Sequence, residues 1–120
     1  MKTHVTLRRA SRYTCRRRIS LQVRFRTKEL EQCYRQSGKA IRKFGRDVGQ
    51  RYILRINLIK AVPDIATLKD LPGLRCHPLH GDRTGQWAAT LIGRSRLIFT
   101  FQNDEMTIVR IEEVSKHYDD

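Results

Sequence analysis

The segment from Cys76 to Trp87, CHPLHGDRTGQW, gathers residue types that can move protons and hold phosphate. It contains His77, His80, Arg83 and the only tryptophan of the sequence. Histidine titrates near neutral pH and can accept or donate a proton, while arginine offers phosphate a planar fork of donors. Metal-free RNA cleavage needs such groups, because the ribose 2′-hydroxyl loses a proton, the leaving 5′-oxygen gains one and the charge on the phosphate must be stabilised.

Each of these residues also has an ordinary structural explanation. A histidine in a strand is often only a hydrogen-bonded structural group, and Arg83 and Arg94 could be plain surface charges. Trp87 either stacks on a base, since aromatic faces bind bases without reading their sequence, or belongs to the core. Arg96 demands more explanation, because it lies within an otherwise apolar segment, SRLIFTF.

The elements that would position these residues are mostly strands. Apolar and polar residues alternate from Ile19 to Arg26, which is the period of a strand with one buried face. Further strands are expected between short turns rich in Gly, Asp and Asn, over residues 74–79, 86–92, 95–101 and 106–114. Such short connections favour antiparallel hairpins.

Two helices are expected between the first strand and the others. Thr27 can cap a helix that runs to about Gln36, and Ser37-Gly38 breaks it. A longer helix spans about residues 46–61 and ends before Pro63, and a short helical turn follows through Leu68. This order predicts an α+β domain in which two helices cover one face of an antiparallel sheet, while Arg, His and Gln side chains emerge on the other.

Length and charge limit the class of protein. The 120 residues fit one domain. A net charge of +13 favours a polyanionic partner, and nucleic acid is the first candidate. The alternatives are a basic surface that only contacts solvent and an acidic protein partner. Cys15, Cys33 and Cys76 lack the spacing of a disulfide framework or a zinc site, which indicates a reducing compartment. We expect no metal and no cofactor. No apolar run approaches the roughly 20 residues that span a bilayer, so we expect a cytoplasmic protein without membrane contact.

Residues 1–18 form a basic N-terminal arm in this interpretation, and residues 19–120 form the domain. Lys2 and six arginines between Arg8 and Arg18 give the arm seven positive charges and no negative one. Without apolar periodicity, the arm is expected to be flexible. A transit peptide and a translation start placed too far upstream are the alternatives.

The segment LPGLRCHPLHGDRTGQWAATLIGRSRLIFTF, residues 71–101, closely resembles the HigB branch of the RelE/ParE toxin superfamily. The resemblance extends from LQVRFRT at residues 21–27 to EEVSKHYDD at residues 112–120, and it leaves the basic arm outside. It implies a RelE-like fold and a toxin of a type II toxin-antitoxin pair. It also implies a metal-independent endoribonuclease that cleaves mRNA in the ribosomal A site, with a HigA-like helix-turn-helix antitoxin as its partner.

The resemblance also assigns site residues. It implies catalytic roles for His77, Arg96 and His117. Contacts with RNA or its phosphates are implied for the remaining matched positions, which are His80, Arg83, Trp87, Arg94 and Tyr118. The sequence departs from the family pattern at His80, where relatives carry lysine, and at Lys116, where tyrosine is expected. At residue 80 the departure replaces a permanently charged side chain by one that titrates. At the C-terminus it leaves two residues, His117 and Tyr118, that could align with the terminal histidine of the family.

Two hypotheses of other classes stay open beside the ribosome-dependent nuclease. One is a ParE-like inhibitor of DNA gyrase that binds without catalysis, for which the histidines would be dispensable. The other is a non-catalytic nucleic-acid-binding protein whose main contact is the basic arm.

Overall fold

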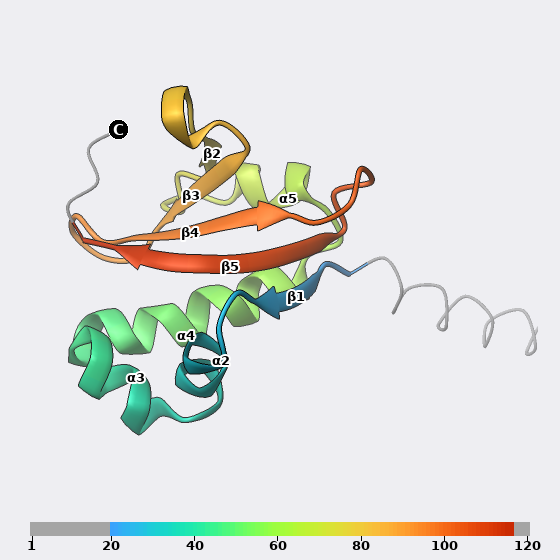
Figure 1. Cartoon of the computed structure of the whole chain (residues 1–120). Coiled ribbons are helices and arrows are strands. Elements are labelled where there is room, and N and C mark those ends of the chain that lie inside the picture. Colours follow the sequence, from blue (N-terminus) through green and yellow to red (C-terminus); the bar gives the residue numbers. More distant parts are fainter. Residues whose placement is uncertain (1–19, 117–120) are drawn as a thin grey trace, which may run out of the picture.

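The computed structural model describes residues 20–116 (Figure 1). Four α-helices precede or flank a five-stranded sheet, and a short 3-10 helix, η1, interrupts the strands. In chain order the elements are β1 (Gln22–Phe25), α2 (Lys28–Arg35), α3 (Ser37–Phe44), α4 (Arg46–Ala61), α5 (Ile65–Asp70), β2 (His77–Pro78), η1 (Gly81–Arg83), β3 (Gln86–Thr90), β4 (Arg96–Phe101) and β5 (Ile108–Ser115). The predicted α+β class is confirmed. The expected basic arm lies outside the described residues.

The strand order in the sheet is β1-β5-β4-β3-β2. The three pairs among β2, β3, β4 and β5 are antiparallel, as the short turns predict. The β1–β5 pair is parallel, so the expectation of a wholly antiparallel sheet is wrong at this edge. Parallel neighbours need a long crossover, and here helices and strands of the whole domain separate the two partners.

The helical region contains one helix more than predicted. Thr27 caps α2 as expected, because its hydroxyl accepts a hydrogen bond of 3.1 Å from the Leu30 amide. Ser37-Gly38, expected only as a break, instead begins α3 directly after Gln36, whose extended backbone ends α2. Gly45, with φ of 94°, then turns the chain into the predicted long helix α4.

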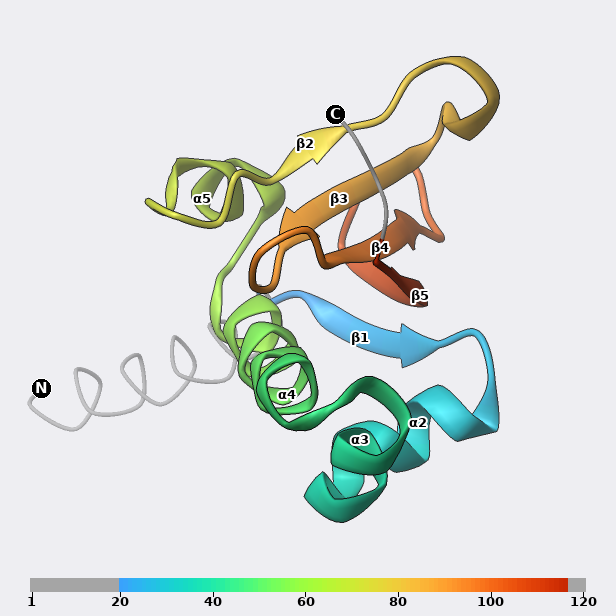
Figure 2. The same ribbon diagram turned by 90° about the vertical axis from the view of Figure 1, so that its left-hand side faces the viewer.

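Helices α2, α3 and α4 lie together on one side of the sheet (Figure 2). Tyr52, Ile56 and Ile59 of α4 are fully buried there, and the Tyr52 hydroxyl donates a hydrogen bond of 2.7 Å to the Leu30 carbonyl. Helices α3 and α4 come so close at Gly49 that a Cβ atom would lie 2.8 Å from the backbone of Ala40. The opposite face of the sheet is the outer face, and among residues 20–116 its buried apolar cluster consists of Leu79, Ala88 and Ile98.

Strand β2 is much shorter than the predicted strand over 74–79. Arg75 adopts a left-handed backbone with φ of 51°, and Pro78 has no amide hydrogen to donate to a neighbouring strand. The start of β5 is also later than predicted, because Met106 has φ of 58° in the preceding turn. Within residues 20–116, no helix combines the length and the apolar character needed to cross a bilayer.

Candidate functional site

The outer face carries one row of residues that crosses four strands. Strand register aligns His77 with Ala88, Ala88 with Ile98, and Ile98 with Glu113. Three strand spacings of about 4.8 Å separate the backbones of His77 and Glu113 by roughly 14 Å. The row thus has a histidine at one end, a carboxylate at the other and an apolar floor between them.

His77 is held in a defined tautomer at the start of β2. Its Nδ1 lies 2.7 Å from the carbonyl oxygen of Arg75. Because a carbonyl only accepts hydrogen bonds, Nδ1 carries the hydrogen, and Nε2 is the basic nitrogen of the neutral ring. His77 is half-buried, so the ring has the fixed orientation and partial solvent access that a proton-transfer group needs.

Arg83 reaches across the outer face from η1. Its Nη1 donates to Oε1 of Gln86 at 3.0 Å, and its Nη2 donates to Oε2 of Glu113 at 3.2 Å. The guanidinium therefore joins the loop before β3 to β5 and contacts Glu113, at the far end of the row that begins with His77. Glu113 was not predicted as a site residue, because a glutamate in a terminal strand looks like an ordinary surface charge.

Arg96 begins β4 at another corner of the same face. Its register partners are Thr90 and Ser115, and its Nη1 donates to the carbonyl of Gly93 at 2.8 Å. It precedes Ile98 by two positions, which places it about 7 Å further along the strands than the His77 row. Among the described residues, its buried Nε has no hydrogen-bond partner, and neither has Thr90 Oγ1.

Trp87 lies on the helix side of the sheet and not on the outer face. Its ring stacks on Phe99 at a centroid distance of 6.5 Å and meets the ring of Phe101 edge-on at 5.8 Å. Lys69 Nζ lies 5.7 Å from the Trp87 ring centroid. Of the two sequence-based explanations, the structure therefore favours the core for this tryptophan.

The remaining predicted residues fall into two groups. His80 and Arg94 are exposed, the first directly before η1 and the second in the turn between β3 and β4. His117 and Tyr118 lie outside the described residues, which end directly after β5.

Cys76 is the residue next to His77, and its thiol is not suited to nucleophilic chemistry. Burial raises its pKa to about 12, while the charge of Lys69 acts in the opposite direction. The thiol is therefore protonated at neutral pH, and the thiolate that would attack a substrate is scarce. Among residues 20–116, no three His, Cys, Asp or Glu side chains are grouped to hold a metal ion.

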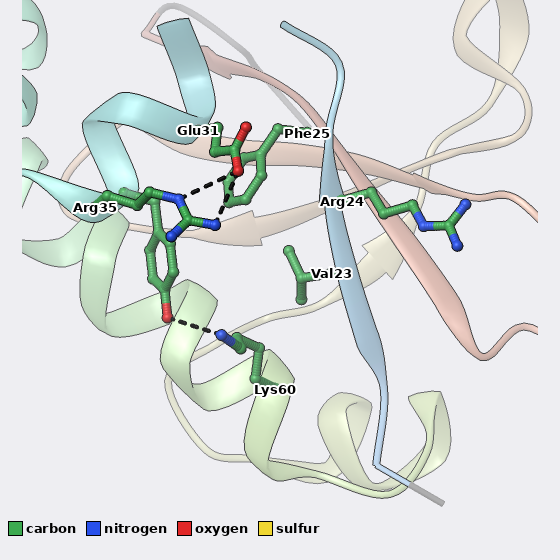
Figure 3. A pocket seen from close by; sticks show the side chains of 7 residues that line it. Val23, Arg24, Phe25, Glu31, Arg35 and Lys60 are labelled. Carbon is green, nitrogen blue, oxygen red and sulfur yellow. Dashed lines mark hydrogen bonds and ion pairs between the residues drawn. The ribbon is translucent and has the colours of Figure 1, made fainter. Parts of the chain in front are cut away.

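A cavity of about 270 Å³ lies away from this face, between β1, α2 and the end of α4 (Figure 3). Arg35 forms an ion pair of 3.0 Å with Glu31 there, and Lys60 donates to the Tyr34 hydroxyl at 3.3 Å. None of the predicted site residues within the described part of the chain lines this cavity.

Comparisons with known proteins agree on the fold. No protein-family model and no curated protein matches the sequence. Similar solved structures include a chain of the YoeB-YefM complex from Staphylococcus aureus, with TM-score 0.53, 16% identity and coverage of 82% of this chain and 98% of that one. A chain of the E. coli DinJ-YafQ toxin-antitoxin complex has TM-score 0.53, 19% identity and coverage of 82% and 93%. YafQ from E. coli strain BL21(DE3) has TM-score 0.52, 18% identity and coverage of 80% and 92%.

The predicted RelE-like fold is confirmed. The three similar proteins share it over nearly their whole length. Sequence identities of 16% to 19% relate the chains by fold and leave the activity to be argued from the site.

Proposed function

We propose that this protein is the toxin of a type II toxin-antitoxin pair and a metal-independent endoribonuclease that cleaves mRNA in the ribosomal A site. The observation that carries the proposal is the placement of His77 and Arg83 over one open face. The tautomer of His77 makes Nε2 its basic nitrogen, and the guanidinium of Arg83 contacts Glu113 at the other end of the same row of the sheet. The similar folds of toxins from toxin-antitoxin complexes support the same class.

In this proposal, His77 accepts the proton of the ribose 2′-hydroxyl. Arg83 stabilises the charge that develops on the phosphate, once the phosphate has replaced Glu113 as an acceptor of its N–H groups. Arg96 supplies a second positive charge at the neighbouring corner. His117 is the proposed donor of a proton to the leaving 5′-oxygen, by the resemblance, while His80, Arg94 and Tyr118 contact the RNA.

The proposed partners are mRNA on the ribosome and a HigA-like helix-turn-helix antitoxin, and the proposed compartment is the cytoplasm. The HigB assignment rests on the segment from Leu71 to Phe101. Co-purification of the protein with the product of a neighbouring gene for a small helix-turn-helix protein tests this partnership. Failure to bind at micromolar concentration contradicts it.

The decisive experiment is primer extension on a translated message after induction of the protein. We expect new 5′ ends inside translated codons, and we expect them to disappear with His77→Ala. Growth arrest without such ends would contradict the nuclease.

A ParE-like inhibitor of DNA gyrase is the second candidate. The YoeB/ParE toxin from Agrobacterium tumefaciens has a similar fold, with TM-score 0.50 and 17% identity over 82% of this chain and 100% of that one. Supercoiling by purified gyrase measures this activity directly. Inhibition that persists in His77→Ala would favour this candidate over the nuclease.

A further inference from the structure

A second group of charged residues lies on the outer face at the β1–β5 edge. Arg24 and Arg110 are register partners in the parallel pair, and Arg26 lies directly after the end of β1. Figure 3 shows the Arg24 side chain leaving β1 on the side opposite Val23. The three arginines were not predicted as site residues, because β1 and β5 are far apart in the sequence.

Glu112 is the carboxylate at the centre of this group. It is only 8% exposed, and it lies where the register between β4 and β5 shifts after Ile98. Its Oε2 accepts hydrogen bonds from Arg110 Nε at 2.7 Å and from Thr100 Oγ1 at 2.8 Å, and its Oε1 lies 3.9 Å from Arg26 Nε. A buried carboxylate with these partners is fixed in place.

The charge of this group is not balanced within the described residues. Arg110 and Arg26 share the single carboxylate of Glu112, and none of the ion pairs within residues 20–116 involves Arg24. Like charges on directly paired strand positions repel each other, so pairing Arg24 with Arg110 costs stability. An anionic ligand would remove this cost.

The contacts with Glu112 also determine which donors stay available. Both Arg110 and Arg26 approach the carboxylate through Nε. An arginine bound through Nε keeps the N–H groups of its two terminal nitrogens for a second acceptor, and phosphate is the acceptor whose geometry matches that fork.

The group continues the face that carries the proposed cleavage site. Register aligns Arg24, Arg110, Thr100 and Gln86 in one row, and Gln86 accepts a hydrogen bond from Arg83. Three strand spacings, or roughly 14 Å, separate the backbones at the two ends of this row. A single strand of RNA with one phosphate at Arg83 can therefore extend over the sheet toward Arg24.

We propose that Arg24, Arg26 and Arg110 form a subsite for an RNA backbone phosphate beyond the cleaved bond, and that Glu112 is a positioning residue for Arg110 and Arg26. The inference rests on the proposed function, which makes RNA the ligand of this face. RNA is favoured over an acidic protein because the subsite shares its face with His77 and Arg83, whereas the broad helical surface lies on the other side of the sheet (Figure 2).

Binding of a fluorescein-labelled single-stranded RNA of about ten nucleotides tests the subsite. Anisotropy is measured over a range of salt concentrations, with His77→Ala in every protein to prevent cleavage. The double variant Arg24→Gln/Arg110→Gln should bind more weakly and reduce the salt slope by about 0.7 for each phosphate contact that is lost. The control Arg46→Gln/Arg51→Gln removes two exposed charges from α4 and should change binding much less. Equal losses in both double variants would overturn the subsite.

Two single variants separate positioning from simple charge. Glu112→Gln raises the net charge by one, so a purely electrostatic effect predicts tighter RNA binding, whereas the positioning role predicts weaker binding. Arg110→Lys keeps the charge but loses the fork, and it should also weaken binding. Circular dichroism checks that both proteins fold. If the Glu112→Gln protein does not fold, RNA binding by Arg110→Lys alone tests the positioning role. Tighter binding by a folded Glu112→Gln, or unchanged binding by Arg110→Lys, contradicts the proposal.

The outcome for the subsite is distinguishable from the outcome for the nuclease. Cleavage of a translated message by the otherwise unaltered protein tests the nuclease alone. Selective loss of RNA binding in Arg24→Gln/Arg110→Gln supports the subsite even if no cleavage is found. If this variant binds RNA normally and instead loses affinity for the antitoxin, the arginines belong to a protein interface and the subsite is wrong.

Discussion

A single hydrogen bond decides which nitrogen of His77 is basic. The Arg75 carbonyl accepts from Nδ1, so Nε2 is the nitrogen that takes part in the proposed proton transfer. Asparagine at this position can still donate a hydrogen bond to that carbonyl, but it has no nitrogen that titrates near neutral pH.

We therefore predict that His77→Asn folds normally and loses cleavage of translated mRNA by a factor on the order of 10² to 10⁴, the usual range for removal of a proton-transfer group. Primer extension measures the cleavage, and thermal unfolding followed by circular dichroism measures the fold. Retention of full cleavage by folded His77→Asn would remove this residue from the mechanism.

The guanidinium of Arg83 holds two acceptors at once, and its planar shape leads to a second prediction. One lysine ammonium cannot reproduce the two planar contacts with Gln86 and Glu113. Arg83→Lys should therefore lower cleavage by about 10-fold or more, although the charge is unchanged, because its fork also supplies the proposed phosphate contacts. The same substitution at exposed Arg42 of α3 serves as the control. Equal activity of the two variants would show that only charge matters at residue 83.

The buried thiol of Cys76 predicts how stability depends on pH. Its pKa rises from 9.0 to about 12 on burial, so between these values the unfolded chain releases a proton that the folded chain keeps. The free energy of unfolding therefore falls as pH rises above about 9, by up to about 1.4 kcal/mol for each pH unit from this group. Urea unfolding at pH 7, 9 and 10 should show a smaller decrease for Cys76→Ala, and identical pH profiles would contradict the assignment.

Among the glycines, Gly49 has the least room for a side chain, because it lies where α3 and α4 are in contact. A Cβ on Gly49 would lie 2.8 Å from the backbone of Ala40, whereas a Cβ on Gly38 would meet only Arg42 Nη1 at 4.0 Å. We predict that Gly49→Ala destabilises the protein by about 1–3 kcal/mol, as overpacking does, while Gly38→Ala is neutral or stabilising. Urea unfolding measures both, and similar stabilities of the two variants would refute the close contact.

Sequence patterns predicted the elements whose signals lie close together along the chain. The capped start of α2, the length of α4 and the antiparallel order of β2 to β5 follow from local signals, namely Thr27, Pro63 and the short turns. The parallel partnership of β1 with β5 has no local signal, so it was missed. For the same reason, His77 and Arg83 could be placed together from one segment, but their partner Glu113 and the whole Arg24, Arg26 and Arg110 group could not.

At the scale of the whole molecule, the net charge of +13 leads to a prediction about the proposed binding to RNA. Residues 1–18 carry seven of the thirteen net positive charges and lie outside the described residues. Deleting residues 2–18 should weaken binding to RNA or ribosomes and flatten its salt dependence, while cleavage at saturating ribosomes persists. Titrations from 50 to 200 mM salt measure the slope. Unfolding of the shortened protein would instead make the arm a structural element.

The parallel pairing of β1 with β5 also determines when a growing polypeptide can complete its outer face. Strand β1 is made early, yet the strand that pairs with it within residues 20–116 is made last of the five. Until β5 has been added, β1 and β4 each lack a neighbour, and Arg83 lacks its partner until residue 113 has been made. The row that joins His77 to Glu113 is therefore among the last parts of the described structure that a growing chain can complete.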